Sequence, residues 1–180
     1  WRVSCERYMP MLRLASLCGV TILPMWNVWD RLMAPGLGDT LLLIRLCTSA
    51  GFALLFLITY HRLATRYAGF ITSLTIIVCT SSLSLILFLM PGGFNFGLVC
   101  ALIPFLWIPL VPSLVSALWS VLISDAVILA LMVMDKLSPT MLINGAFMLS
   151  TVSLIAMAMN YIIIQTRKAS FLFETNMEQA

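Results

Sequence analysis

Long apolar runs alternate with short polar breaks along the whole chain. A helix needs about 20 mainly apolar residues to cross the hydrocarbon core of a bilayer. Six runs approach or reach this length, and we interpret each as one crossing: Leu12–Trp29, Leu41–Tyr60, Tyr67–Met90, Phe94–Val111, Leu114–Met134 and Met141–Ile164. The pattern predicts an all-α membrane protein, a six-transmembrane helical bundle.

The breaks between runs contain residues that favour turns. They are "DRLMAPGLGD" at Asp30–Asp39, "MPGG" at Met90–Gly93, "LVPS" at Leu110–Ser113 and "DKLSPT" at Asp135–Thr140. Proline and glycine are the strongest local breaks in a helical pattern. The third break is the least marked, because one proline is almost its only signal. Pro104 and Pro109 lie inside the fourth run, so we expect that helix to be kinked or short.

Composition supports the membrane interpretation. Hydrophobic residues make up 62% of the chain and charged residues only 9%, whereas a soluble domain has about 25% charged residues. The net charge of +3 is small and concentrated at the ends of the runs. This distribution indicates how the chain is oriented in a bilayer. We expect no nucleic-acid partner.

The positive charges predict which side each loop faces. If the N-terminus is inside, the inner side holds Arg2, Arg7, Arg13, Arg62, Arg66, Arg167 and Lys168, and the outer side holds Arg31, Arg45 and Lys136. Cytoplasmic loops are enriched in Lys and Arg. We therefore expect both termini in the cytoplasm, with a cytoplasmic segment at 1–11, the transmembrane domain at 12–164 and the start of a cytoplasmic transducer helix at 165–180.

Ionisable groups inside a membrane segment are costly and often functional. Asp125 lies near the middle of the fifth run, and Arg45 lies about one turn inside the second. They could form a buried pair, or Arg45 could reach outward to Asp39 or Asp30, which would leave Asp125 protonated or bonded to hydroxyls. We expect Asp125 to face the bundle interior and contact the hydroxyl-rich third run or Arg45.

Further polar residues inside the runs are candidates for a ligand site: Asn27, Asn144, Ser120 and Ser124. The two serines belong to a stripe with Ser113 and Ser116 at helical spacing. Such stripes usually indicate close helix packing, although a polar-lined pocket is an alternative. An apolar or amphiphilic small molecule is the ligand class we expect.

Several chemistries find no support in the sequence. His61 is the only histidine, so two-histidine haem ligation is excluded. No Ser-His-Asp arrangement, phosphate-binding loop or metal-ligand spacing is present. We expect no cofactor, no metal and no catalytic residue in this chain.

The last stretch, "NYIIIQTRKASFLFETNMEQA", leaves the membrane without a helix breaker. Arg167 and Lys168 mark the inner surface. Beyond them Ala169, Leu172 (or Phe173) and Asn176 share one face at a spacing of 3–4 residues, as in a parallel coiled coil with a register-fixing Asn. The alternative is a short helix lying on the lipid. Both chain ends, including Trp1, look internal, so we expect a piece of a longer protein.

Two stretches resemble a known family. "NVWDRLMAP…LLLIRL" (Asn27–Leu46) and "INGAFMLSTVSLIAMAMNYIIIQTRKASFLFE" (Ile143–Glu174) are similar to the six-helix membrane region of bacterial class III adenylate/guanylate cyclases, and to related sensor regions of diguanylate cyclases and histidine kinases. The matching residues are Asp30, Ile44, Arg45, Tyr161, Arg167, Lys168, Phe171, Leu172 and Glu174.

The resemblance implies a homodimeric receptor or anchor in the cell inner membrane. Its sixth helices, through Tyr161, Arg167, Lys168, Leu172 and Asn176, would pass a signal to a cytoplasmic effector, first of all a nucleotide cyclase. A histidine-kinase or diguanylate-cyclase sensor is the first alternative. A small transporter or half-transporter, with Asp125 on a substrate path, is the second.

Overall fold

The computed structural model describes residues 2–61 and 64–179, and the side chains within these ranges other than 2–8, 96, 171 and 173–179. This part of the chain is helical, without strands. Its elements in order are α1 (Arg2–Met25), α2 (Asn27–Met33), the 3-10 segment η1 (Pro35–Leu37), α3 (Gly38–Ile58), α4 (Ala68–Leu89), α5 (Gly93–Leu102), the 3-10 segment η2 (Ile103–Leu110), α6 (Leu114–Met134) and α7 (Pro139–Gln179). An all-helical fold is therefore confirmed.

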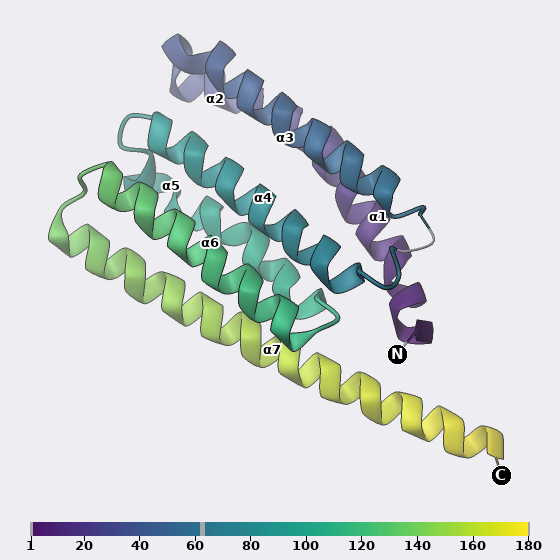
Figure 1. The fold of residues 1–180 in the computed structure, drawn as a ribbon. Helices are drawn as coiled ribbons and strands as arrows, with labels where there is room; N and C mark the ends of the chain where they lie inside the picture. Colours follow the sequence, from purple (N-terminus) through teal and green to yellow (C-terminus); the bar gives the residue numbers. More distant parts are fainter. Residues whose placement is uncertain (1, 62–63, 180) are drawn as a thin grey trace.

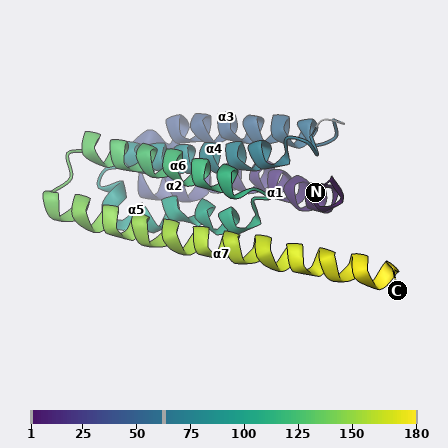
Figure 2. The same ribbon diagram turned by 60° about the horizontal axis from the view of Figure 1, so that its bottom comes forward.

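The helices run back and forth as an up-and-down bundle (Figure 1). α1 and α3 pack together as one layer, and α4 joins this layer to a second group formed by α6, η2 and α7. Both ends of the chain lie at the same end of the bundle, and α7 extends far beyond the other helices there (Figure 2).

Five helical segments in the described part are long and apolar enough to cross a membrane: Met9–Met33, Pro35–Ile58, Ala68–Leu89, Leu114–Met134 and Pro139–Ser170. Five of the six predicted crossings therefore correspond to helical segments of sufficient length and apolar character. The first segment is longer than predicted, because α2 continues as helix to Met33 through the start of the expected loop. Only at Pro35 and Gly36 does the chain turn, where proline and glycine break the helical pattern.

The fourth predicted helix is divided. Ten residues form α5, and the next eight form the 3-10 segment η2. Pro104 and Pro109 explain the change, because proline lacks the N–H that an α-helical bond requires and its ring crowds the preceding turn. Runs of 3-10 helix longer than 3–4 residues are uncommon. The expectation of a kinked or short fourth helix is therefore confirmed.

The turn before α5 depends on two glycines. Gly92 adopts a φ of 66°, in the left-handed region that glycine occupies without strain. A Cβ atom on Gly93 would lie 2.1 Å from the carbonyl oxygen of Leu87. This close approach returns the chain from α4 directly into α5.

The serine stripe of α6 lies against α4. Ser120 and Ser124 are fully buried, as are Thr80 and Ser84 of α4, and α4 and α6 form one of the most extensive helix contacts in the bundle. The Ser73 hydroxyl donates to the carbonyl oxygen of Ser116 across this contact at 2.8 Å. Small residues allow backbones to approach and hydroxyls to bond between helices. Here the stripe serves helix packing.

α7 is a single helix of 41 residues, about 60 Å long at 1.5 Å per residue. A bilayer core of about 30 Å accounts for only half of it. Its inward face, formed by Gly145, Leu149, Ser153, Ala156 and Asn160, is buried, where α7 packs on η2, α6 and α5. The unbroken helix predicted from Asn160 onward is present as far as Gln179.

Candidate functional site

A buried ion pair joins α2 to α3. Arg45 Nη2 donates to Asp30 Oδ1 at 2.8 Å, and Arg45 Nε donates to Asp30 Oδ2. Both residues are almost completely buried, with 1% of Asp30 and 3% of Arg45 exposed. The short turn through η1 folds α3 back beside α2, which brings the two side chains together. Such two-point pairing is geometrically specific as well as strong.

A second set of contacts surrounds this turn. Arg31 Nη2 donates to Asp39 Oδ1 at 3.0 Å, and both side chains are exposed. The Asn27 amide, oriented to satisfy both of its ends, donates to the Gly38 carbonyl oxygen at 3.1 Å and accepts from Arg31 Nε at 3.3 Å. Paired polar groups therefore stabilise the end of the bundle that is formed by α2, η1 and the start of α3.

Arg45 does not pair with Asp125. The structure supports the alternative in which Arg45 reaches Asp30. The reason is topological: α3 packs on α1, α2 and α4, whereas Asp125 belongs to α6, which packs on α4, η2 and α7. Of the two alternatives that the sequence left open, the structure has the outward pair with Asp30 and not the pair with Asp125.

Asp125 bonds to the last helix. The Ser153 hydroxyl of α7 donates to Asp125 Oδ2 at 2.9 Å, and Asp125 Oδ1 has no hydrogen-bond partner among the described residues. Asp125 is half-buried. The expected hydrogen bond to the hydroxyl-rich third run or to Arg45 is thus corrected. Asp125 accepts from Ser153 of α7 instead, so it ties α6 to the helix that extends from the bundle.

The predicted polar residues lie in separate places. Asn27 and Arg45 stand at one end of the bundle with Asp30. Ser120 bonds to its own helix at the Ser116 carbonyl, 2.9 Å away, and Ser124 is buried beside Asp125 in sequence. Asn144 is exposed near the start of α7. These residues do not converge on one ligand pocket.

Asn160 is a site that the sequence interpretation missed. It is fully buried on α7, and its Nδ2 donates to the carbonyl oxygens of Ile108 at 2.9 Å and Val111 at 2.8 Å. A third carbonyl, that of Pro109, lies at 3.4 Å. Carbonyl groups at a helix end lack partners within the helix. Asn160 supplies a donor to these carbonyls, of which that of Ile108 also accepts from the Val111 N–H at 3.0 Å. The only signal in the sequence was a single amide within an otherwise apolar stretch.

The residues assigned to signal transmission follow on the same helix. Tyr161, Lys168 and Leu172 are exposed, and Arg167 is half-buried. Asn176 belongs to the helix backbone, but its side chain lies outside the described residues. In the described part of the chain no group of three His, Cys, Asp or Glu residues could hold a metal ion.

These observations define the class: an integral membrane helical domain with internal polar ties and one helix that projects from it. The chain belongs to the MASE8 family of membrane-associated sensory domains, which matches residues 28–178. No curated protein and no solved structure matches the chain. The chain is therefore a membrane sensory domain. The family match does not confirm the resemblance to the membrane region of class III cyclases.

Proposed function

We propose that this chain is the sensory module of a homodimeric receptor in the cell inner membrane, and that paired α7 helices carry its signal to a C-terminal cytoplasmic output domain. A nucleotide cyclase is the output we place first, with a diguanylate cyclase or a histidine kinase as alternatives of the same architecture. The observation that carries the proposal is the uninterrupted helix from Pro139 to Gln179. A signal can pass only through an element with two arrangements that the input biases, and a pair of continuous helices is such an element.

An exposed seam on α7 supports pairing. Continued toward the membrane, the 3–4 spacing of Ala169 and Leu172 selects Asn144, Met148, Thr151, Ile155, Ala158, Ile162 and Gln165, and all nine residues are exposed. Three of them, Thr151, Ala158 and Ala169, are small. Small residues let membrane helices approach one another. The seam reaches the tail without a change of register.

The neighbouring exposed stripe is bulky. It contains Ile143, Phe147, Leu154 and Tyr161, each more than half exposed. Large apolar side chains alone suit contact with lipid tails, whereas the seam, in which Thr151, Ala158 and Ala169 stand between larger residues, suits a second helix. We therefore assign the seam to a second copy of this chain and the bulky stripe to lipid.

We also propose that α5 and η2 together make the sixth crossing, which leaves both termini in the cytoplasm. The ten residues of α5 and the eight of η2 give about 15 Å and about 16 Å, because 3-10 helix rises about 2.0 Å per residue. Their sum is close to the bilayer core of about 30 Å. The arginine asymmetry favours the same orientation.

Disulfide crosslinking along α7 tests the dimer. Single cysteines at Ala158, Ile162 and Ala169, in a chain whose own cysteines are replaced, should crosslink between copies in native membranes. Matched cysteines at Leu154 and Tyr161 should crosslink poorly, because they lie on the bulky stripe. Equal crosslinking at both sets, or none at either, would rule out the seam as the dimer interface.

A second experiment tests transmission. Two glycines inserted after Lys168 in the full-length receptor should uncouple the output from the membrane domain, because each costs about 1 kcal/mol in a helix and loosens it. Two alanines at the same place shift the register equally but keep the helix rigid, so they serve as the control. Retention of normal regulation with both insertions would contradict a rigid α7 link.

A further inference from the structure

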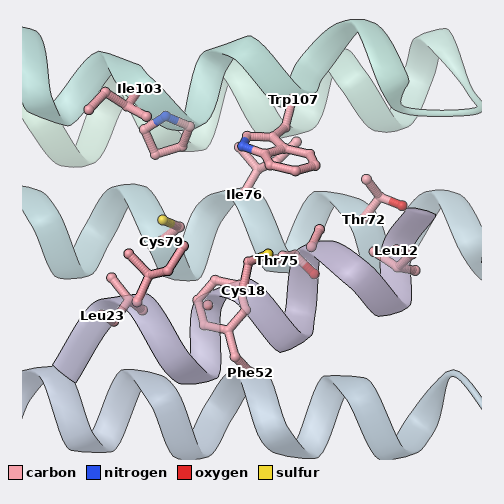
Figure 3. Close-up of a pocket in the computed structure, with 14 residues that line it drawn as sticks. Leu12, Cys18, Leu23, Phe52, Thr72, Thr75, Ile76, Cys79, Ile103 and Trp107 are labelled. Carbon is pink, nitrogen blue, oxygen red and sulfur yellow. The ribbon is translucent and has the colours of Figure 1, made fainter. Parts of the chain in front are cut away.

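An apolar cavity lies between the two groups of helices. It has a volume of about 230 Å³ and is bounded by α1, α3, α4 and η2. Figure 3 shows Leu12, Cys18 and Leu23 of α1 on one side and Trp107 of η2 on the opposite side. Phe52 of α3 closes the cavity from below in this view.

No residue in its lining carries a charge. The polar oxygens in the lining are the hydroxyls of Thr72 and Thr75, and each donates to a carbonyl of its own helix, at 2.7 Å and 2.8 Å. A buried water needs two to four polar partners, and this lining offers few. Because α1, α3 and α4 belong to segments long and apolar enough to cross a membrane, we expect the molecules that reach the cavity to come from the hydrocarbon phase.

The cavity is elongated along α1. Its wall there includes Leu12, Ala15, Gly19 and Leu23, which cover about 16 Å of helix at 1.5 Å per residue. The small side chain of Ala15 leaves space in this wall, whereas the Phe52 ring packs directly against Gly19, where an added Cβ atom would lie 2.5 Å from it. A narrow, apolar space of this length suits a flexible hydrocarbon chain better than a compact ring system.

The segment η2 forms a wall of the cavity and also a contact of α7. Ile103, Pro104 and Trp107 face the cavity, while the carbonyl oxygens of Ile108 and Val111, at the end of the same segment, accept from Asn160 of α7. A long 3-10 stretch often marks a hinge. A displacement of Trp107 therefore moves η2, the segment whose end is hydrogen-bonded to Asn160 of α7.

We propose that this cavity binds one hydrocarbon chain, and that its occupancy shifts η2 and, through Asn160, the position of α7. The transmission step rests on the proposed function of α7 as the signalling helix, whereas the binding step does not. The chain could belong to a membrane phospholipid or to a free fatty acid. Both present the same chemistry to the cavity, so the experiment needs one arm for each.

Fluorescence quenching tests binding. The chain is placed in nanodiscs with Trp107 as its sole tryptophan, and is titrated with dibromostearic acid in one arm and with a phospholipid carrying one brominated chain in the other. Saturable quenching at one ligand per chain in either arm supports the proposal and identifies the source. Quenching that rises without saturation in both arms, as for lipid contact alone, overturns it.

Matched variants separate the cavity from the surface. Ala15→Phe fills the cavity and should abolish the saturable phase, and Cys79→Phe should do the same from α4. Leu14→Phe, on the exposed face of α1, should leave it unchanged. A folded Ala15→Phe or Cys79→Phe protein that still saturates like the parent would place the ligand elsewhere and reject the cavity.

Spin labels test transmission within one chain. Cysteines at Phe70 of α4 and Lys168 of α7, in labelled protein diluted with unlabelled protein, report the position of α7 relative to the bundle. Ligand should change the distance distribution, and Asn160→Leu should remove the change while binding persists. Saturable binding with no distance change would overturn the transmission step. If ligand binding saturates and changes the distance distribution but the cysteines on the seam do not crosslink, the dimer proposal is refuted. The inference that the cavity binds a hydrocarbon chain and moves α7 then still holds.

Discussion

The amide nitrogen of Asn160 lies 2.9 Å from the carbonyl oxygen of Ile108 and 2.8 Å from that of Val111. One side chain on α7 thus satisfies the end of η2, a segment about 50 residues away in sequence. Carbonyl groups without partners in a membrane interior cost several kcal/mol, so this contact fixes where α7 crosses η2.

We predict that Asn160→Leu lowers the free energy of unfolding by about 1–3 kcal/mol, because the Val111 and Pro109 carbonyls lose this donor. The Ile108 carbonyl keeps its bond from the Val111 N–H. Asn160→Asp should cost more, because a carboxylate oxygen would face carbonyl oxygens. Unfolding of the single chain by dodecyl sulfate in mixed micelles, followed by circular dichroism, measures both. Asn144→Leu, at an exposed amide on the same helix, is the control and should change little. Equal stability of all three variants would remove Asn160 as a structural tie.

The Asp30–Arg45 pair should behave as a buried ion pair. Arg45→Leu leaves the Asp30 carboxylate buried without its partner, and we expect a loss of about 3–5 kcal/mol. The double variant Asp30→Leu with Arg45→Leu should recover most of this loss, because well-packed apolar residues often replace such a pair at little cost. Arg31→Ala breaks the exposed pair with Asp39 and should cost less than about 1 kcal/mol. The same unfolding assay applies, and a double variant as unstable as Arg45→Leu would contradict the pairing argument.

We expect the structure to tolerate loss of the Asp125 charge better than loss of the hydrogen bond that Asp125 accepts from Ser153. Asp125→Asn keeps an oxygen that can accept from Ser153, so we expect its stability to stay within about 0.5 kcal/mol of the parent. Ser153→Ala should cost about 0.6–1.7 kcal/mol, between the average and the largest value for hydrogen bonds between membrane helices. A larger loss for Asp125→Asn than for Ser153→Ala would show that the carboxylate has another role.

The membrane topology can be tested at the ends of the fourth run. If α5 and η2 cross the bilayer, a cysteine at Ser113 should react with an impermeant maleimide from the same side as one at Lys168, and from the opposite side to one at Pro91. The native cysteines are replaced, and sealed vesicles of known orientation give the readout. Labelling of Ser113 and Pro91 from one side would leave five crossings and place the termini on opposite sides.

The sequence predicted the helices better than their contacts. Apolar length alone locates α3, α4 and α6 to within a few residues, because a bilayer imposes one requirement on every crossing. It misjudged the stretch around Asp30, since "DRLM" contains no breaker and the helix continues until Pro35. It anticipated that Pro104 and Pro109 would disturb the fourth helix, but no sequence rule states that the result is 3-10 helix.

The polar contacts were less predictable, because they depend on which helices are neighbours. Arg45 had three possible partners in the sequence: Asp125, Asp39 and Asp30. The packing of α3 away from α6 rules out Asp125, and Asp39 pairs with Arg31, which leaves Asp30 for Arg45. Asn160 stands out in the sequence only as an amide in an apolar stretch, and its partners could not be predicted because they are backbone carbonyls, which every residue possesses. The cavity beside Trp107 is likewise invisible in sequence, because it is bounded by residues from four separate elements.

The length of α7 gives the domain a lever. The helix is held by its neighbours up to about Asn160, and Gln179 lies 19 residues further, about 28 Å at 1.5 Å per residue. A tilt of about 5° at the fulcrum would carry the far end sideways by about 2.5 Å, which is larger than the shifts of about 1–2 Å that repack helices at subunit interfaces. The part of α7 beyond Asn160 therefore magnifies small movements. Removing seven residues from it, about two turns, would keep the orientation of the helix face at its far end but reduce the sideways displacement there.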